Sequence, residues 1–192
     1  MNKSSFKSDI YPILFLTIVV CIAVIGLVFT NSVTEERIEE ARIQALREIL
    51  STQFPDMEDF EYHEDIHVYT ILDQDQEIIG YAFETKADGY GGDIELLIAL
   101  EATDMTEGNM IVKGISILFH AETPGLGARI EESSFLDQFK GTNVQDIRLA
   151  ADGGDIDAIS GATVSTEAVV NTVHESVLEK ATLIRESMEV SA

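Results

Sequence analysis

The chain has little of the chemistry that usually marks a metal or disulfide protein. Its 192 residues include one cysteine, Cys21, and no tryptophan. A single cysteine excludes an internal disulfide, c-type haem attachment and any cluster held by several thiolates of this chain. Four histidines are present, and only His63 and His67 are close in sequence, in a stretch that favours entry to a strand. We therefore predict no metal site.

Basic residues are also scarce. Lys and Arg number 12 against 35 Asp and Glu, a formal net charge of −23. Residues 1–9 hold two of the basic residues and one acid, so the remainder carries 10 − 34 = −24. Such a surface repels nucleic acid and anionic lipid headgroups, which makes both poor partners. It suits a basic protein surface or a salty medium, and it equally suits a face that only keeps the domain soluble.

Charged residues are absent from residues 10–30, which are rich in Ile, Leu, Val and Phe. At the helical rise this run spans roughly 30 Å, the thickness of a bilayer core. We predict an uncleaved transmembrane helix. A secretory signal peptide is the alternative, but the run is long for one and no small-x-small cleavage site follows it.

The charges on either side of this run predict its orientation. Two lysines precede it and two glutamates soon follow it, so the positive-inside tendency places the N-terminus in the cytoplasm. The predicted organisation is a cytoplasmic N-terminus (1–9), a transmembrane helix (10–30), a stalk helix and linker (31–61), and a globular domain (62–192). That domain would lie on the outer, or periplasmic, side of the cytoplasmic membrane.

Hydrophobic periodicity predicts an α+β domain, a sheet with helices packed against it. Helical patterns cover residues 33–53, 133–139 and 164–189, and strand patterns cover residues 67–72, 78–85, 94–102 and 111–120. Residues 54–61 have the composition of a linker or turn, and residues 73–77 that of a hairpin turn.

The segment Asp157-Ala158-Ile159-Ser160-Gly161-Ala162-Thr163 directly precedes the longest helical pattern of the domain. A helix N-terminus offers unpaired N–H groups and a positive dipole end, which together bind phosphate well. Gly161 and Ala162 leave the neighbouring hydroxyls unobstructed. The segment is therefore typical of a place that holds, or esterifies, a phosphorylated cofactor. Thr163 considered alone is equally compatible with an ordinary helix N-cap.

Two further loops carry residues of interest. His120-Ala121-Glu122-Thr123-Pro124-Gly125-Leu126-Gly127 follows a predicted strand, with a carboxylate and a hydroxyl in a tight turn. A strand-ending turn without further function explains it equally well. The loop at residues 87–93 holds three glycines, which allow a ligand to approach the backbone closely.

Taken together, these motifs resemble the FMN-binding domain family. Asp157-x-x-Ser160-Gly161-Ala162-Thr163 resembles its flavinylation motif, and Glu122-Thr123-Pro124-Gly125-Leu126-Gly127 resembles the loop that contacts the flavin. With one N-terminal span, the chain is similar to the G subunits of Rnf-type ion-translocating electron transport complexes. The C subunits of sodium-pumping NADH:quinone reductases are related but typically longer.

This resemblance implies FMN bound covalently, through a phosphoester to the Thr163 hydroxyl, installed by a flavin transferase from FAD with magnesium. It implies that Ser160, Gly161 and Ala162 surround the phosphate and that Asp157 orients the loop or assists the transferase. The isoalloxazine ring would contact Glu122, Thr123, Leu126 and Gly127, and Gly125 and Tyr90 are further candidates for cofactor binding. Lys140 is a weaker assignment, as a cation for the phosphate or the flavin anion. No residue is expected to act as a general acid or nucleophile on a soluble substrate.

The implied function is that of an electron-transfer subunit in a membrane complex that couples ferredoxin- or NADH-type electron transfer to movement of Na⁺ or H⁺. The implied partners are the other integral membrane subunits, among them a multi-span flavoprotein, with a possible redox partner outside the membrane. Two alternatives stay open: a non-redox assembly or docking subunit, and a flavoprotein that feeds an extracellular reductase.

Overall fold

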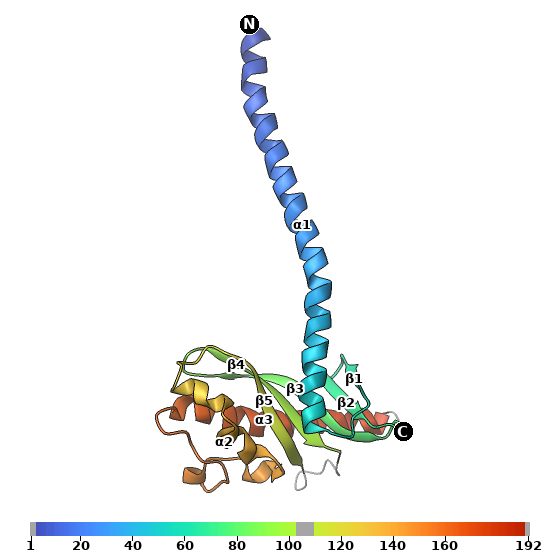
Figure 1. The fold of residues 1–192 in the computed structure, drawn as a ribbon, viewed down its shortest axis with the longest axis vertical. Helices are drawn as coiled ribbons and strands as arrows, with labels where there is room; N and C mark the ends of the chain where they lie inside the picture. The colour runs from blue at the N-terminus through green and yellow to red at the C-terminus, as the bar shows by residue number, and fades with distance from the viewer. Residues whose placement is uncertain (1–2, 103–109, 191–192) are drawn as a thin grey trace. The chain divides into compact units, whose positions relative to one another are not determined.

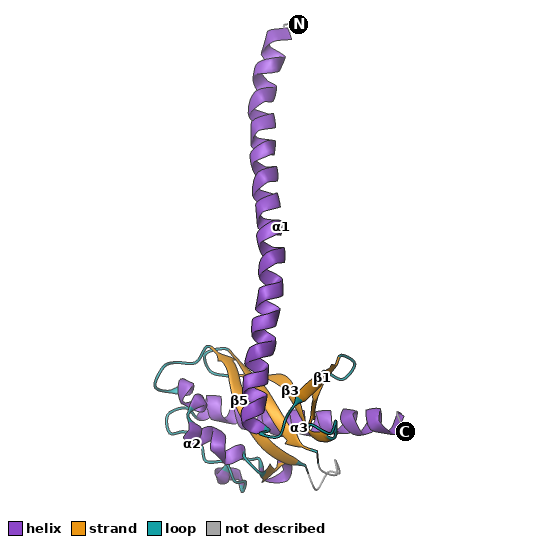
Figure 2. Cartoon of the chain, turned by 45° about the vertical axis from the view of Figure 1, so that its right-hand side comes forward, coloured by secondary structure: helices purple, strands orange, loops and turns teal. Residues whose placement is uncertain are grey.

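Six strands pair in the order in which they occur along the chain, forming one antiparallel sheet (Figures 1 and 2). The strands are β1 (Asp59–His63), β2 (Val68–Leu72), β3 (Ile78–Asp88), β4 (Asp93–Glu101), β5 (Ile111–His120) and β6 (Thr142–Asn143). The α-helices are α1 (Lys3–Gln53), α2 (Ser133–Leu136) and α3 (Thr163–Val190), and the 3-10 helices are η1 (Gly127–Glu131), η2 (Asp137–Phe139), η3 (Val144–Asp146) and η4 (Ala150–Asp152). This computed structural model describes residues 3–102 and 110–190. The predicted α+β class is confirmed.

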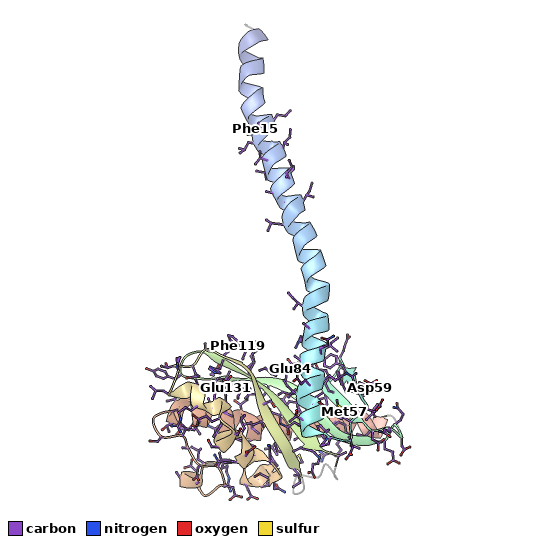
Figure 3. All side chains as sticks on the ribbon, viewed as in Figure 1. Phe15, Met57, Asp59, Glu84, Phe119 and Glu131 are labelled. Atoms are coloured by element: carbon purple, nitrogen blue, oxygen red, sulfur yellow. The ribbon has the colours of Figure 1, made fainter. Side chains whose placement is uncertain are left out.

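The helix α1 ends at Gln53, two residues before Pro55, where the sequence predicts the stalk helix to end. The chain divides into two compact units, residues 1–48 and 49–192. In the first unit, large apolar side chains between Leu14 and Leu27 are exposed, and Phe15 projects from the helix with 70% of its surface accessible (Figure 3).

Among the helical residues that the structure describes, none forms a stretch long and apolar enough to cross a membrane. The predicted span, residues 10–30, reaches at both ends into residues whose side chains lie outside the described set (10–13 and 28–30).

Part of one predicted connection, residues 54–61, belongs to a strand. Residues 54–61 were expected to form a linker or turn, but β1 begins at Asp59 and pairs with β2 in the register Phe60↔Ile71. Its side chains are mostly exposed, so it lacks the apolar alternation that reveals a buried strand. Cross-strand aromatic pairs stabilise it instead: the Tyr62 and Tyr69 ring centroids lie 4.8 Å apart. The two-residue β6 is too short for any pattern.

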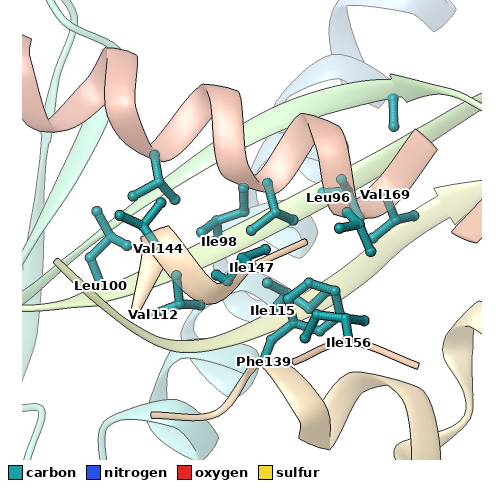
Figure 4. Close-up of a cluster of buried hydrophobic side chains, with 14 of the residues drawn as sticks. Leu96, Ile98, Leu100, Val112, Ile115, Phe139, Val144, Ile147, Ile156 and Val169 are labelled. Atoms are coloured by element: carbon teal, nitrogen blue, oxygen red, sulfur yellow. The ribbon is translucent and has the colours of Figure 1, made fainter. Parts of the chain in front are cut away.

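The main core lies between one face of the sheet and α3 (Figure 4). Leu96, Ile98 and Leu100 alternate along β4 and point to this face, as the period of two in a strand requires. From α3, the predicted apolar stripe, including Val169 and Val173, is buried against them. The segment after β5 contributes the remaining side of the core through Phe139, Val144, Ile147 and Ile156.

The opposite face of the sheet is covered by the end of α1 and by Phe54, which is 1% exposed. Two glycines make this approach possible. A Cβ added at Gly80 would lie 2.2 Å from Cε1 of Phe54, and one at Gly114 would lie 2.2 Å from Oε1 of Gln53. Because both faces of the central strands are covered, β4 is apolar on both sides.

Strand register brings the two predicted loops together at one end of the sheet. Asp88, the last residue of β3, is paired with Asp93, so the glycine loop 89–92 is the tip of a hairpin. Ile94, one residue further, is paired with His120, the last residue of β5. The loop that begins at His120 therefore starts beside the glycine loop.

Candidate functional site

The helix α3 begins at Thr163, which makes Thr163 the first helical residue and Ala162 the residue in the N-cap position. Gly161 has φ +82°, a left-handed conformation that glycine adopts without strain. Thr166 orders this turn: its hydroxyl donates to the Ala162 carbonyl over 2.9 Å and accepts from the Ile159 N–H over 3.3 Å. The Thr163 side chain is exposed, so its hydroxyl is accessible at the start of the helix.

Glu122 is the buried charged residue of the site, with 6% of its surface exposed. Its Oε1 accepts a hydrogen bond from the Gly91 N–H over 3.0 Å, and its Oε2 accepts one from the Ser165 hydroxyl over 2.9 Å. The carboxylate therefore joins three segments: the glycine loop, the loop after β5 and the first turn of α3.

Glycines form the cradle in which this carboxylate lies. A Cβ added at Gly89 would lie 2.2 Å from Oε1 of Glu122, and one at Gly127 would lie 2.1 Å from Oε2. Real Cβ atoms do not approach so closely, so any side chain at these two positions would displace the carboxylate. The buried carboxylate of Glu122 therefore requires glycine at one position in each loop, whether or not a ligand is bound.

His120 extends the network away from the pocket. The Glu122 N–H donates to Nδ1 of His120 over 3.1 Å, so the ring proton of neutral His120 lies on Nε2. That Nε2 is 3.2 Å from Oε1 of Glu131, at the end of η1. The ring thereby fixes the start of the loop that carries Glu122.

A pocket of about 430 Å³ opens in front of this network. Its volume lies in the range of small-molecule sites. The two predicted motifs and the glycine loop all contribute to its walls. The lining residues are Tyr90, Glu122, Thr123, Leu126, Gly127, Gly161, Ala162, Thr163, Val164 and Ser165.

The walls combine apolar surface with the accessible hydroxyl of Thr163. Tyr90 is 77% exposed, Leu126 50% and Val164 51%, an unusual exposure for such side chains around one opening. Leu126 lies over the turn before the helix, because its Cδ2 is 3.5 Å from where a Cβ of Gly161 would be. A flat aromatic ring would find apolar contacts here, next to a helix N-terminus suited to a phosphate.

Four of the residues predicted for the site do not line this pocket. Gly125 forms the preceding turn with φ +76°. Lys140 pairs with Asp137, its Nζ 2.6 Å from Oδ1. Ser160 and Asp157 belong to the turn before Thr163 and are held there by other side chains. Their roles, and that of Lys140, stay predictions.

The side chains that hold the turn before Thr163 were not predicted from the sequence. Gln138 brackets the backbone of Asp157: its Oε1 accepts from the Asp157 N–H over 2.6 Å, and its Nε2 donates to the Asp157 carbonyl over 3.5 Å. Nη1 of Arg129 donates to the Ser160 carbonyl over 3.4 Å. Val164 and Ser165 also line the pocket and were not predicted, because residues one and two positions after Thr163 do not share its face of the helix.

Comparison with known proteins agrees with this arrangement. Residues 89–177, from the glycine loop to the middle of α3, match the FMN-binding domain. The chain is 33% identical over 166 residues to the G subunit of the ion-translocating oxidoreductase complex of Methanosarcina acetivorans, covering 82% of this chain and 86% of that one. It is 34% identical to the protein of the same name from Shewanella loihica, over 90% of this chain and 88% of the relative.

The crystal structure of Shewanella oneidensis NqrC is similar over 68% of this chain and 74% of that chain, with 18% sequence identity and a TM-score of 0.47. On the strength of the sequence relatives, the fold and site belong to the class of FMN-binding domains. More particularly, the chain belongs to the family formed by the G subunits of ion-translocating oxidoreductase complexes.

Proposed function

We propose that this chain is an electron-transfer flavoprotein subunit of a membrane-bound complex, in which FMN attached to Thr163 relays electrons coupled to ion translocation. The observation that carries the proposal is the position of Thr163. Its exposed side chain stands at the start of α3 and lines the same pocket as Glu122, Thr123 and Leu126. An attachment point and a ring-sized pocket thus share one opening.

The residues present suit this cofactor. Gly161 and Ala162 leave the approach to the Thr163 hydroxyl clear, and the first N–H groups of α3, beyond reach of any carbonyl within the helix, can bind phosphate oxygens. Leu126 and Val164 offer apolar surface for the ring. When bound, the flavin supplies one- and two-electron redox chemistry, and the protein supplies position and electrostatics.

We assign Glu122 a structural role in addition to the ring contact that its motif implies. Both of its carboxylate oxygens accept hydrogen bonds from the protein, from Gly91 and from Ser165. Its part is to fix the walls of the pocket, so that the N-terminus of α3 and the glycine loop keep their spacing. Thr123, Leu126 and Gly127 line the same pocket and are further groups of this loop that would meet the ring.

Attachment of the cofactor requires a partner enzyme. The Thr163 oxygen would attack the FMN-side phosphorus of FAD, the bond from that phosphorus to the bridging oxygen would break, and AMP would leave with that oxygen. The hydroxyl proton would pass to solvent. A flavin transferase with magnesium would catalyse this step.

The N-terminal segment anchors the domain. Leu14, Phe15 and Leu27 exemplify large apolar side chains that no protein surface covers, and Phe15 is 70% exposed. In water such a surface is unfavourable, whereas a bilayer would cover it. We assign residues 10–30 to a single membrane span, with residues 1–9 in the cytoplasm and the flavin domain outside.

Cysteine-directed reagents that do not cross membranes test this topology. They are applied to cells that carry either S4C or S187C in a Cys21→Ala background.

Other membrane subunits, including a multi-span flavoprotein, would donate and accept the electrons and move Na⁺ or H⁺. A single uncharged span offers no path for an ion, because ion pathways need polar groups within the membrane. The electron carrier therefore acts in the complex without conducting the ion itself.

In-gel fluorescence tests the proposed attachment directly. The full chain is expressed with a flavin transferase, denatured and separated, and the band is examined for flavin fluorescence and for a mass increase of one FMN. Wild type and Thr182→Ala, which changes an exposed threonine of α3 outside the pocket, should both be fluorescent, and Thr163→Ala should be dark. A dark wild-type band beside a fluorescent control substrate of the same transferase would refute the covalent carrier, and would favour a docking subunit.

A further inference from the structure

A guanidinium from the loop after β5 reaches the backbone of the attachment motif. Arg129 lies in η1, two residues after Gly127, which lines the pocket. Its Nη1 donates to the Ser160 carbonyl over 3.4 Å, three residues before Thr163. We propose that Arg129 is the cation of the flavin site, which positions the Ser160–Gly161 turn and binds the phosphate once it is attached.

The hydrogen-bonding capacity of the side chain supports a second ligand. Arg129 uses Nε for Oε1 of Glu132, over 3.2 Å, and Nη1 for the Ser160 carbonyl. A guanidinium has five N–H donors, so three remain. The side chain is 39% exposed, which leaves those donors open to an incoming group. Phosphate oxygens match the planar fork of a guanidinium in charge and geometry.

Arg129 is a positive charge among several acidic side chains near the pocket. Glu122 lines the pocket, Glu132 pairs with Arg129, and Glu131, in the same 3-10 helix as Arg129, pairs with His120. A phosphodiester on Thr163 adds another negative charge to this acidic setting. The dipole of α3 offsets part of that repulsion, and Arg129 supplies a full positive charge on the side of the preceding turn.

Lys140, the cation that the sequence suggested, is less well placed. Its Nζ is 2.6 Å from Oδ1 of Asp137, and both side chains belong to the same exposed turn. Arg129, by contrast, contacts the motif. The structure therefore favours Arg129 over Lys140 as the partner of the phosphate.

This inference rests on the proposed attachment to Thr163, and it predicts a kinetic effect on that reaction. In the transfer from FAD, the Thr163 O–P bond forms and the P–O bond to AMP breaks, with the proton released to solvent. Arg129 would hold the turn that presents the hydroxyl and stabilise charge on the phosphoryl oxygens. Removing a hydrogen bond to a charged group has an effect of about 1.5–3 kcal/mol, or roughly 10- to 100-fold in rate.

The test compares Arg129→Gln with Arg148→Gln, the same change at an exposed arginine whose Nε contacts the Gln145 carbonyl instead. Full-chain apoprotein is incubated with FAD, magnesium and transferase, and flavin incorporation is timed. Arg129→Gln should react at least about 10-fold more slowly than both wild type and Arg148→Gln. Arg129→Lys should fall between, because lysine keeps the charge but not the fork.

A second measurement separates phosphate binding from mere support of the turn. The ³¹P resonance of the attached FMN should move in Arg129→Gln and stay in place in Arg148→Gln. Equal rates and equal resonances in these two variants would overturn the inference and leave the attachment intact, whereas an unlabelled wild type would overturn the attachment itself. If circular dichroism shows Arg129→Gln unfolded, Arg129→Lys decides: an unchanged rate and resonance would overturn the inference.

Discussion

The Oε2 of Glu122 accepts a 2.9 Å hydrogen bond from the hydroxyl of Ser165, which lies 43 residues further along the chain. This contact joins the loop after β5 to the first turn of α3. Its importance lies in what it links, because the two segments carry the two motifs of the FMN-binding domain. The spacing between the loop proposed to contact the ring and Thr163, the proposed attachment residue, is therefore set by a buried side-chain hydrogen bond.

Replacing Glu122 should destabilise the domain. Glu122→Ala leaves the Gly91 N–H and the Ser165 hydroxyl without their acceptor, at a cost of about 3 kcal/mol. Glu122→Gln should cost only about 1 kcal/mol, because the amide can accept from Gly91 and donate to Ser165. Urea unfolding followed by circular dichroism gives both values. Equal stability of wild type and Glu122→Ala would contradict the central position assigned to this carboxylate.

Gly127→Ala should be harmful because of Glu122. The new Cβ would lie 2.1 Å from Oε2 of Glu122, a clash expected to cost about 1–3 kcal/mol in wild type. In a Glu122→Ala background the nearest obstacle is gone and Oγ of Ser165, 2.8 Å from the new Cβ, remains, so the cost should fall by at least about 1 kcal/mol without vanishing. Gly125→Ala is the matched control: its cost comes from φ +76°, with nothing within 4 Å, and should be the same in both backgrounds. If the free-energy costs of Gly127→Ala and Glu122→Ala were strictly additive, the residues around Gly127 would have to move aside at little cost.

Tyr81 should make stability depend on alkaline pH. Burial raises the pKa of Tyr81 above that of the unfolded chain, near 10. Above about pH 10 the unfolded state loses this proton first and binds fewer protons than the folded state, so stability falls as pH rises, by up to about 1.4 kcal/mol per pH unit. Urea midpoints between pH 8 and 11 should decline less steeply for Tyr81→Phe than for wild type. Parallel declines would assign the alkaline loss to other groups.

Gln138→Ala should slow cofactor attachment without unfolding the domain. The side chain holds the Asp157 N–H over 2.6 Å, and its loss frees that end of the motif, so that the backbone must be ordered again during the reaction. Ordering one residue costs about 1 kcal/mol, or roughly fivefold in rate. A time course of flavin incorporation measures this, with Gln74→Ala in the β2–β3 turn as control. A rate equal to that of Gln74→Ala would remove Gln138 from the positioning of the motif.

The strands and helices that were predicted correctly are those whose pattern has a local cause. The run from Ile111 to His120 is β-branched and apolar, and β5 has the same bounds. The apolar stripe of α3 follows the helical repeat, and Val173 and Val177 are fully buried. The strand β1 was missed because an exposed edge strand buries too little to impose a pattern on its sequence.

The residues of the site that belong to its two sequence motifs could be predicted. Thr163 and Leu126 were expected at a common ligand and line one pocket. Arg129 and Gln138 were not predicted. Their partners are backbone atoms of Ser160 and Asp157, and every residue type has the same backbone atoms, so the sequence gives no sign of such a contact. Lys140 was a weaker assignment, made for its charge, and its pairing with Asp137 three residues earlier was not considered.

The order of the sheet, in which every strand pairs with its neighbour in sequence, also bears on the timing of maturation. Strands β1 to β5 follow one another through short connections, whereas β6 is reached through a longer segment, residues 121–141. Pairings between strands that are neighbours in sequence lower the contact order, which favours rapid folding. We therefore expect the apoprotein to reach its native fold rapidly, before any cofactor is attached. In the proposed attachment, the flavin transferase would therefore recognise the folded surface around Thr163 rather than an unfolded segment.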